Sequence, residues 1–205
     1  MKKNEFRLLE SMIDNKSYKR ELAYAKIDFN SMEIVGTDTR RAIKIKLREN
    51  EVYMCSGVHY MHKKILKAFT QLMSNDIEYK FENNHLVVGD EILQLNTLGD
   101  KVGFNYPKLE LEYKYDTEYI SSNIMYIDFD TTHNNTHINS EAFKTLQEFG
   151  DAKEYIVKTK AQVKDVAGLV KIIGRVEDED YVLVTRFEVL LMGLVYIPPQ
   201  PTLFD

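Results

Sequence analysis

The sequence predicts an α+β protein of antiparallel sheets with helices on one face, built as two domains of which the second is truncated. Short segments with alternating apolar side chains are joined by turn residues, as in antiparallel strands. A pattern of helix, strand, turn, strand and glycine recurs after about 52 residues, so that Phe29–Asp38 matches Phe81–Asp90. The last part of the chain repeats this pattern in outline, with one helix in place of two.

The first domain is predicted to cover residues 1–113. Its first helix, Asn4–Asp14, carries Phe6, Leu9 and Ile13 on one face. Its second helix, Tyr60–Ser74, has an apolar stripe with lysines beside it. The predicted strands of this domain are Arg20–Phe29, Met32–Val35, Ala42–Leu47, Val52–Met54, Ile77–Phe81, His85–Val88 and Glu91–Thr97.

The second domain is predicted to cover residues 114–197, after a linker at Lys101–Tyr113. Its helix, Ser140–Phe149, can be capped by Asn139 or Ser140 and is stopped by Gly150. Residues 198–205 are expected to form a flexible tail. The predicted strands are Ile124–Phe129, Glu154–Lys160, Leu169–Val176, Tyr181–Phe187 and Val189–Ile197.

Composition and motifs give little sign of an enzyme. The chain has 205 residues, a formal net charge of -5 and a single cysteine, Cys55, which excludes an internal disulfide and fits a cytoplasmic location. No signal peptide, nucleotide-binding loop or nucleophile elbow is recognisable. His133 and His137 fit a solvated loop better than a zinc pair, and Glu177–Asp180 reads as an acidic turn. We therefore expect no catalytic residue, cofactor or metal.

Basic side chains gather on both helices of the first domain. Residues 60–74 hold three lysines and no acidic residue, and further basic residues lie at the start of the first helix. A solvated helix face would explain the lysines alone. The two helices together predict a positive surface that contacts duplex DNA through its phosphates, independently of sequence. The candidate DNA-binding residues are Lys2, Lys3, Arg7, Lys63, Lys64 and Lys67.

The joint between two predicted strands, Val35–Ala42, carries more hydroxyl and charged side chains than a hairpin turn needs. It resembles the Val-Ala-Thr-Asp-Gly-His-Arg-Leu segment in the middle domain of the bacterial DNA polymerase III beta subunit, a member of the DNA sliding clamp family. Thr37, Asp38 and Arg41 match that segment. Phe104–Pro107 resembles the family's Phe-Pro-Asp-Tyr linker, and Val189–Leu194 resembles its terminal strand.

The resemblance implies a DNA-clamp-like fold and a non-enzymatic processivity factor that binds DNA polymerase or other replication proteins. It places a partner-peptide pocket at Thr37, Thr39, Arg41, Ala42, Pro107 and Met192. Thr39 and Ala42 replace glycine and leucine, which alters the shape of such a pocket. The alternative is a structural turn that no longer forms a pocket. Ring closure would require a homo-oligomer.

The end of the chain resembles the Gln-x-x-Leu-Phe peptide by which proteins bind bacterial clamps. The matching residues are Gln200, Leu203 and Phe204. This tail could dock on another sliding clamp or on a second copy of this protein. It supports an alternative function, that of an adaptor with the clamp fold that does not encircle DNA and binds a clamp or polymerase through its tail.

Overall fold

The computed structural model describes residues 2–14, 16, 19–72, 79–95, 106–107, 113–122, 152–161 and 168–192. Its helices are α1 (Lys3–Ser11) and α2 (Lys63–Leu72). The strands of the first part are β1 (Tyr24–Asp28), β2 (Glu33–Thr37), β3 (Arg41–Lys46), β4 (Val52–Tyr53), β5 (Val58–His62), β6 (Tyr79–Glu82), β7 (His85–Val88) and β8 (Glu91–Gln94). Those of the second part are β9 (Thr117–Ser121), β10 (Glu154–Lys160), β11 (Leu169–Glu177) and β12 (Leu183–Met192).

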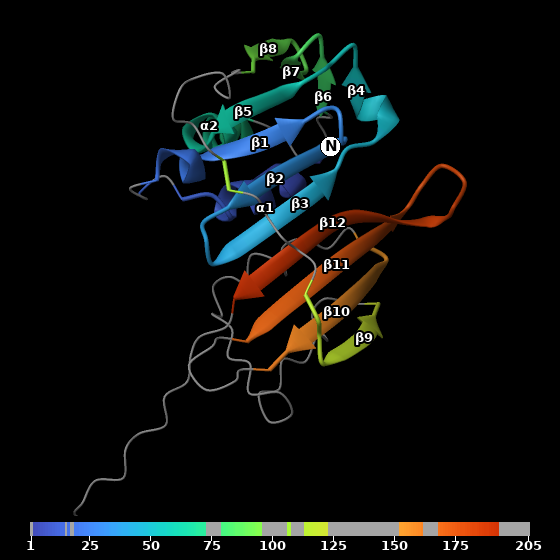
Figure 1. Cartoon of the computed structure of the whole chain (residues 1–205). Helices are drawn as coiled ribbons and strands as arrows, with labels where there is room; N and C mark the ends of the chain where they lie inside the picture. The colour runs from blue at the N-terminus through green and yellow to red at the C-terminus, as the bar shows by residue number, and fades with distance from the viewer. Residues whose placement is uncertain are drawn as a thin grey trace, which may run out of the picture.

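One large antiparallel sheet runs through both parts of the chain (Figure 1). Its eight strands follow the order β5-β1-β2-β3-β12-β11-β10-β9. The last strand pairs antiparallel with β3, which places Val189 opposite Ile43. A second sheet has the order β4-β6-β7-β8, and only the two-residue pairing of β4 with β6 is parallel. The predicted antiparallel α+β architecture is therefore confirmed.

The internal repeat is visible as two units of one helix followed by a three-stranded meander. The first unit is α1 with β1, β2 and β3, and the second is α2 with β6, β7 and β8. The hairpin of the second unit turns at Asn83 and Asn84, whose φ angles are 51° and 60°. Asparagine tolerates this left-handed conformation, which the tightest hairpins require at both central residues.

Helix α1 packs closely on the large sheet because β2 offers it a glycine. A Cβ atom at Gly36 would lie 2.9 Å from the Leu9 side chain and 3.2 Å from that of Ile13. Aromatic side chains connect the two sheets, since the ring centroids of Phe29 and Phe81 lie 5.4 Å apart. All these apolar residues belong to one buried core.

Several predicted boundaries are wrong in the first part. Helix α2 begins at Lys63, not at Tyr60, because Tyr60 belongs to β5, which pairs along the whole of β1. The apolar side chains just before Lys63 therefore belong to a strand of the large sheet and not to the apolar stripe of a helix. The strand predicted from Arg20 begins at Tyr24, after a 3₁₀ turn over Arg20–Ala23.

The two strands predicted near the C-terminus are one strand, β12. Tyr181 and Val182 lie before it in an exposed turn. The predicted strand Ile124–Phe129, the helix Ser140–Phe149 and the tail lie outside the described residues. The domain boundary at residue 113 stays a prediction. Across the described ranges, neither helix has the length and apolar character needed to cross a membrane.

Candidate functional site

The basic residues of the two helices lie on one layer. Helices α1 and α2 pack together, and the Thr70 hydroxyl lies 3.4 Å from a Glu10 carboxylate oxygen. Arg7, Lys64 and Lys67 are exposed, while Phe6 and Leu66 point into the core. Lys2 is exposed and Lys3 is half-buried near the start of α1. The fold therefore presents cations from both helices.

Lys63 differs from the other candidate lysines. Its ammonium donates a hydrogen bond of 2.6 Å to the Ile13 carbonyl, just beyond the end of α1. Burial lowers the pKa of this ammonium. A cation at the C-terminal end of a helix is favourable because the last carbonyls carry partial negative charge. Lys63 thus ties the two helices together, and Lys64 and Lys67 are more accessible for a ligand.

The joint Thr37–Arg41 is held by its own side chains. The Thr37 hydroxyl donates to the Arg41 carbonyl at 2.8 Å and accepts from the Thr39 amide at 3.1 Å. Asp38 accepts from the Arg41 amide at 2.7 Å and pairs with the Arg41 guanidinium at 2.6 Å. These bonds support Thr39 at a φ of 77°, where a β-branched residue is strained.

The end of the last strand meets this joint. The Met192 amide donates to the Arg40 carbonyl at 2.9 Å, and Leu190 lies opposite Ala42 in the sheet. Met192 is 46% exposed, whereas Ala42 is buried at 5%. Thr37, Thr39, Arg41, Ala42 and Met192 are therefore brought together, although Thr37 and Ala42 contribute to the core rather than to an accessible wall.

Pro107 follows a residue that is anchored near the joint. The Tyr106 hydroxyl donates to the Val35 carbonyl at 3.1 Å, and the Tyr106 ring lies 6.0 Å from that of Tyr60. Burial raises the pKa of the Tyr106 hydroxyl, which keeps it protonated as a donor. Tyr106 thus holds its neighbour Pro107 close to β2.

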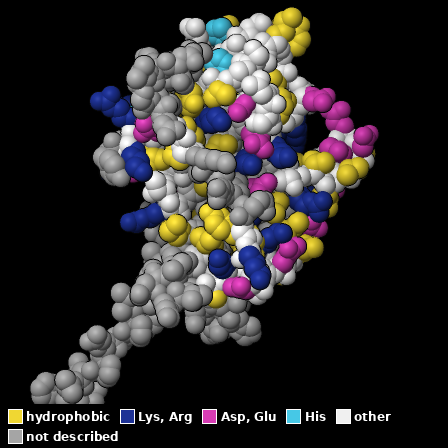
Figure 2. Space-filling model, in the orientation of Figure 1, with side chains coloured by type: hydrophobic (Ala, Val, Ile, Leu, Met, Phe, Trp, Pro, Cys, Tyr) yellow, Lys and Arg dark blue, Asp and Glu magenta, His cyan; other side chains and the backbone are white. Residues whose placement is uncertain are grey.

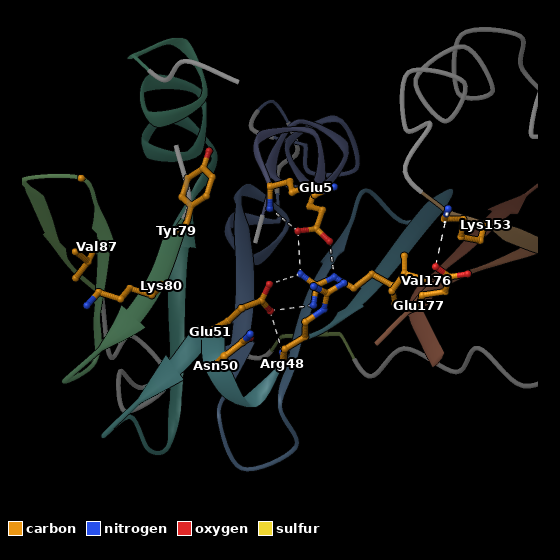
Figure 3. A pocket seen from close by; sticks show the side chains of 13 residues that line it. Glu5, Arg48, Asn50, Glu51, Tyr79, Lys80, Val87, Lys153, Val176 and Glu177 are labelled. Carbon is orange, nitrogen blue, oxygen red and sulfur yellow. Dashed lines mark hydrogen bonds and ion pairs between the residues drawn. The ribbon is translucent and has the colours of Figure 1, made fainter. Parts of the chain in front are cut away.

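A cavity of about 750 Å³ lies elsewhere, between the second sheet and the end of β11 (Figure 3). Lys80 lines it from β6, and Lys153 and Glu177 line it from the second part of the chain. The residues at its floor form a buried ion triad in which Arg186 lies between Glu5 and Glu51. The sequence analysis did not identify this cavity or this triad.

Arg186 has all its donors engaged. Its guanidinium contacts Glu51 at 2.6 and 2.9 Å and Glu5 through Nε and, at 2.9 Å, through Nη2. Nη1 also donates to the Lys46 carbonyl at 2.6 Å. The two glutamates in turn accept backbone amides, from Lys2 at 2.6 Å and from Arg48 at 2.8 Å. A buried cation with every hydrogen bond satisfied is structural rather than reactive.

A β-bulge explains how an arginine enters the interior here. Gly174 of β11 pairs with Phe187 and Arg175 pairs with Thr185, which leaves Arg186 as the extra residue on β12. Because a bulge breaks the strict alternation of faces, Arg186 and Phe187 are both buried although they are neighbours. The Phe187 ring packs directly against the backbone of Gly174, where an added Cβ would lie 2.1 Å from the ring.

The triad sets the ionisation of Glu51. Burial raises the pKa of Glu51, but hydrogen bonds and charge from Arg186 outweigh it and lower this pKa to about 2. One signal in the sequence could have revealed the pairing. A lone arginine within the apolar run of β12 needs a buried partner, since arginine is almost never fully buried unpaired.

The other candidates that the structure describes offer no reactive site, and His133 and His137 lie outside the described residues. Burial raises the pKa of the Cys55 thiol, which disfavours the nucleophilic thiolate. The acidic residues Glu177–Asp180 gather on the exposed β11–β12 hairpin (Figure 2). No cluster of histidine, cysteine, aspartate or glutamate in the described part of the chain could hold a metal ion. Gln200, Leu203 and Phe204 lie outside the described residues.

Comparison with solved structures finds the sliding-clamp fold. A Helicobacter pylori beta clamp in complex with carprofen has a TM-score of 0.58 and 14% identity, over 95% of this chain and 64% of that one. The Thermotoga maritima DNA polymerase III beta subunit has a TM-score of 0.58 and 10% identity, over 96% and 63%. The Helicobacter pylori clamp bound to a DNA ligase peptide has 0.56 and 15%, over 95% and 63%.

The predicted resemblance to the sliding clamp is thus confirmed for the fold. The chain spans less than two thirds of the length of these clamp structures. No family model matches the sequence, and no curated protein matches it.

Proposed function

We propose that this chain is a sliding-clamp-like processivity factor that contacts duplex DNA through its backbone. The observation that carries the proposal is the layer of two packed helices, in a clamp fold, from which Arg7, Lys64 and Lys67 project into solvent. Exposed cations on such a layer match the regularly spaced phosphates of a duplex without reading its bases. The net charge of -5 concentrates binding on this layer and disfavours contacts elsewhere.

Salt dependence of DNA binding tests this proposal. Lys64→Ala combined with Lys67→Ala removes two accessible charges and leaves the Lys63 bond to α1 intact. Since each phosphate contact contributes about 0.9 to the slope of log affinity against log salt, we expect the slope to fall by about two, equally on unrelated duplexes. Lys46→Ala with Lys114→Ala, two exposed lysines off the helices, is the control with the same change in charge.

An unchanged slope in the helix variant, or an equal fall in the control, contradicts DNA binding by this layer. Retention on closed circular DNA then separates encirclement from surface contact, because only a closed ring is released when the circle is linearised. Mass measurement in solution reports whether copies of the chain assemble. A closed oligomer supports a ring, and a monomer supports the adaptor function.

The joint at Thr37–Arg41 is the proposed docking place for peptides of replication proteins. Its support is the convergence of the joint with exposed Met192 at the end of β12. One solved clamp of the same fold is bound to a DNA ligase peptide. Met192→Lys places a charge at this surface without disturbing the core, so we expect it to abolish peptide binding. Ile120→Lys, at an exposed apolar position on β9, is the matched control.

A second candidate function rests on the tail residues Gln200, Leu203 and Phe204. An adaptor would use them to dock on another clamp. Burying two such apolar side chains gains roughly 3–6 kcal/mol before ordering costs, which supports about micromolar to millimolar affinity. We expect Leu203→Ala with Phe204→Ala to abolish binding to a bacterial clamp in a titration.

Two outcomes separate self-docking from the adaptor function. If Met192→Lys blocks the interaction of the tail as well, the tail binds the joint of a neighbouring copy. If the tail substitutions alone matter, the pocket belongs to another clamp. A tail peptide that binds neither protein contradicts both.

A further inference from the structure

The cavity between the second sheet and the end of β11 is lined mainly by charged side chains. Its exposed charged residues form a rim of four cations and one carboxylate, with a formal charge of +3. The triad at the floor has one guanidinium and two carboxylates, which brings the formal charge of the whole lining to +2. The chain as a whole carries -5, so the cavity is a positive site on an acidic protein. The rim residues are Lys2, Arg48, Lys80, Lys153 and Glu177.

The carboxylates within reach of the rim are already engaged or only weakly paired. Both glutamates of the triad contact the Arg186 guanidinium, and each also accepts a backbone amide. At the rim, Lys80 pairs with Glu82 at 2.8 Å, whereas Lys153 lies 3.9 Å from Glu177, beyond hydrogen-bond distance. Exposed ion pairs of this kind contribute little to stability. An incoming anion can therefore pair with the cations of the rim.

Size and charge narrow the class of ligand. A cavity of about 750 Å³ has the size of a small-molecule site. Arg48 lines it from just before the 3₁₀ turn Glu49–Glu51, and Lys153 lines it from just before β10 (Figure 3). A ligand that pairs with both needs two separated negative groups. Linked phosphates meet this need within a small molecule, because each carries negative charge and several acceptor oxygens that suit arginine and lysine.

We propose that this cavity binds a small polyphosphate anion, either free or as the phosphate chain of a nucleotide. Arg48 and Lys153 pair with its phosphates. The exposed Asn50 amide, which donates to Glu179 at 3.4 Å, lies in the same lining and is a neutral donor for the ligand. The site shares only Lys2 with the candidate DNA-binding residues and lies on other elements than α2, so it does not depend on the DNA-binding proposal.

Isothermal titration calorimetry of the whole chain with inorganic triphosphate at pH 7.5 tests the site. We expect saturable binding of one anion per chain, which weakens as salt is added, and a melting temperature that rises with the ligand. Arg48→Gln with Lys153→Gln removes two exposed cations of the rim, keeps the triad and should weaken binding at least tenfold. Lys64→Gln with Lys67→Gln removes the same charge from α2 and should leave triphosphate binding unchanged.

A single isosteric substitution tests the lining independently. Asn50→Asp keeps the shape of an exposed side chain and adds one negative charge to the cavity, so we expect triphosphate to bind several-fold more weakly. A comparison with ATP identifies the source of the phosphates, and both of its results support the site. Tighter binding of ATP than of inorganic triphosphate assigns a nucleotide, and equal or weaker binding assigns a free polyphosphate.

Four results overturn the proposal. Triphosphate does not bind, or citrate, a tricarboxylate of similar size, binds as tightly. The substitutions on α2 weaken triphosphate binding as much as those in the cavity, which would show that any exposed cation serves. Arg48→Gln with Lys153→Gln weakens duplex DNA binding as much as triphosphate binding, which would assign the cavity to the DNA-binding surface instead.

Discussion

Replacing Arg186 with methionine removes the cation that Glu5 and Glu51 share and leaves an unbranched apolar stem in its place. The three side chains are only 3%, 7% and 8% exposed. Little water therefore reaches the two carboxylates to solvate them once the guanidinium is gone. Removing one partner of a buried ion pair costs about 3–5 kcal/mol, and we expect Arg186→Met to lower the free energy of unfolding at pH 7 by this amount.

The effect depends on pH with a definite sign. The pKa of Glu51 falls from 4.5 to about 2 on folding, because Arg186 outweighs the opposing effect of burial. A carboxyl of this kind stabilises the fold above pH 4.5, and the contribution is lost as the pH falls through 4.5 toward 2. At about 1.36 kcal/mol per pKa unit it amounts to about 3 kcal/mol. The variant lacks it, so its stability approaches that of the wild type across this range.

Urea unfolding followed by circular dichroism at pH 7 and pH 3 measures both effects. Arg175→Met is the matched control on the neighbouring strand, since Arg175 pairs with Glu154 at 2.8 Å near the surface, where its side chain is 35% exposed. That variant should lose at most about 1 kcal/mol. A loss below about 1 kcal/mol for Arg186→Met at pH 7, or a loss that is equal at both pH values, would refute the reasoning.

Two further substitutions probe packing and helix contact. Gly174→Ala forces a Cβ to within 2.1 Å of the buried Phe187 ring. We therefore expect urea unfolding to show that the free energy of unfolding falls by about 3 kcal/mol. Adding Phe187→Leu should restore part of this stability. No recovery in the double variant would show that the ring is not the obstacle. Lys63→Met removes the 2.6 Å hydrogen bond to the Ile13 carbonyl but keeps the apolar stem of the side chain. A thermal melt should show that the free energy of unfolding falls by about 1–2 kcal/mol. Lys64→Met is the control and should not share this loss.

The sequence predicted where the strands lie along the chain better than which strands pair with one another. Alternating side chains and the paired asparagines at Asn83–Asn84 located the hairpins, because both signals are local. Tyr60 was assigned to a helix because its apolar neighbours fit a helical stripe. Pairing with β1, distant in sequence, decides for a strand instead. A local pattern cannot report which strand lies alongside.

For the candidate site as well, features formed by consecutive residues were predicted, and features formed by distant residues were missed. The joint at Thr37–Arg41 was found because its residues are consecutive, and its side chains do bond to one another. The Arg186 triad was missed because its members lie far apart in the sequence and meet only through a bulge. Lys63 was grouped with its neighbours by charge, and only its contact with Ile13 separates it from them.

The pairing of β12 with β3 has a consequence for how the chain is made. A ribosome completes Glu5 and Glu51 long before Arg186, which follows them by 181 and 135 residues. Until then the growing chain holds two carboxylates that cannot be buried and a third strand with one side unfilled. Contacts between such distant residues form slowly because a long loop must close first. The nascent amino-terminal half therefore stays open to chaperones and proteases until β12 has been synthesised.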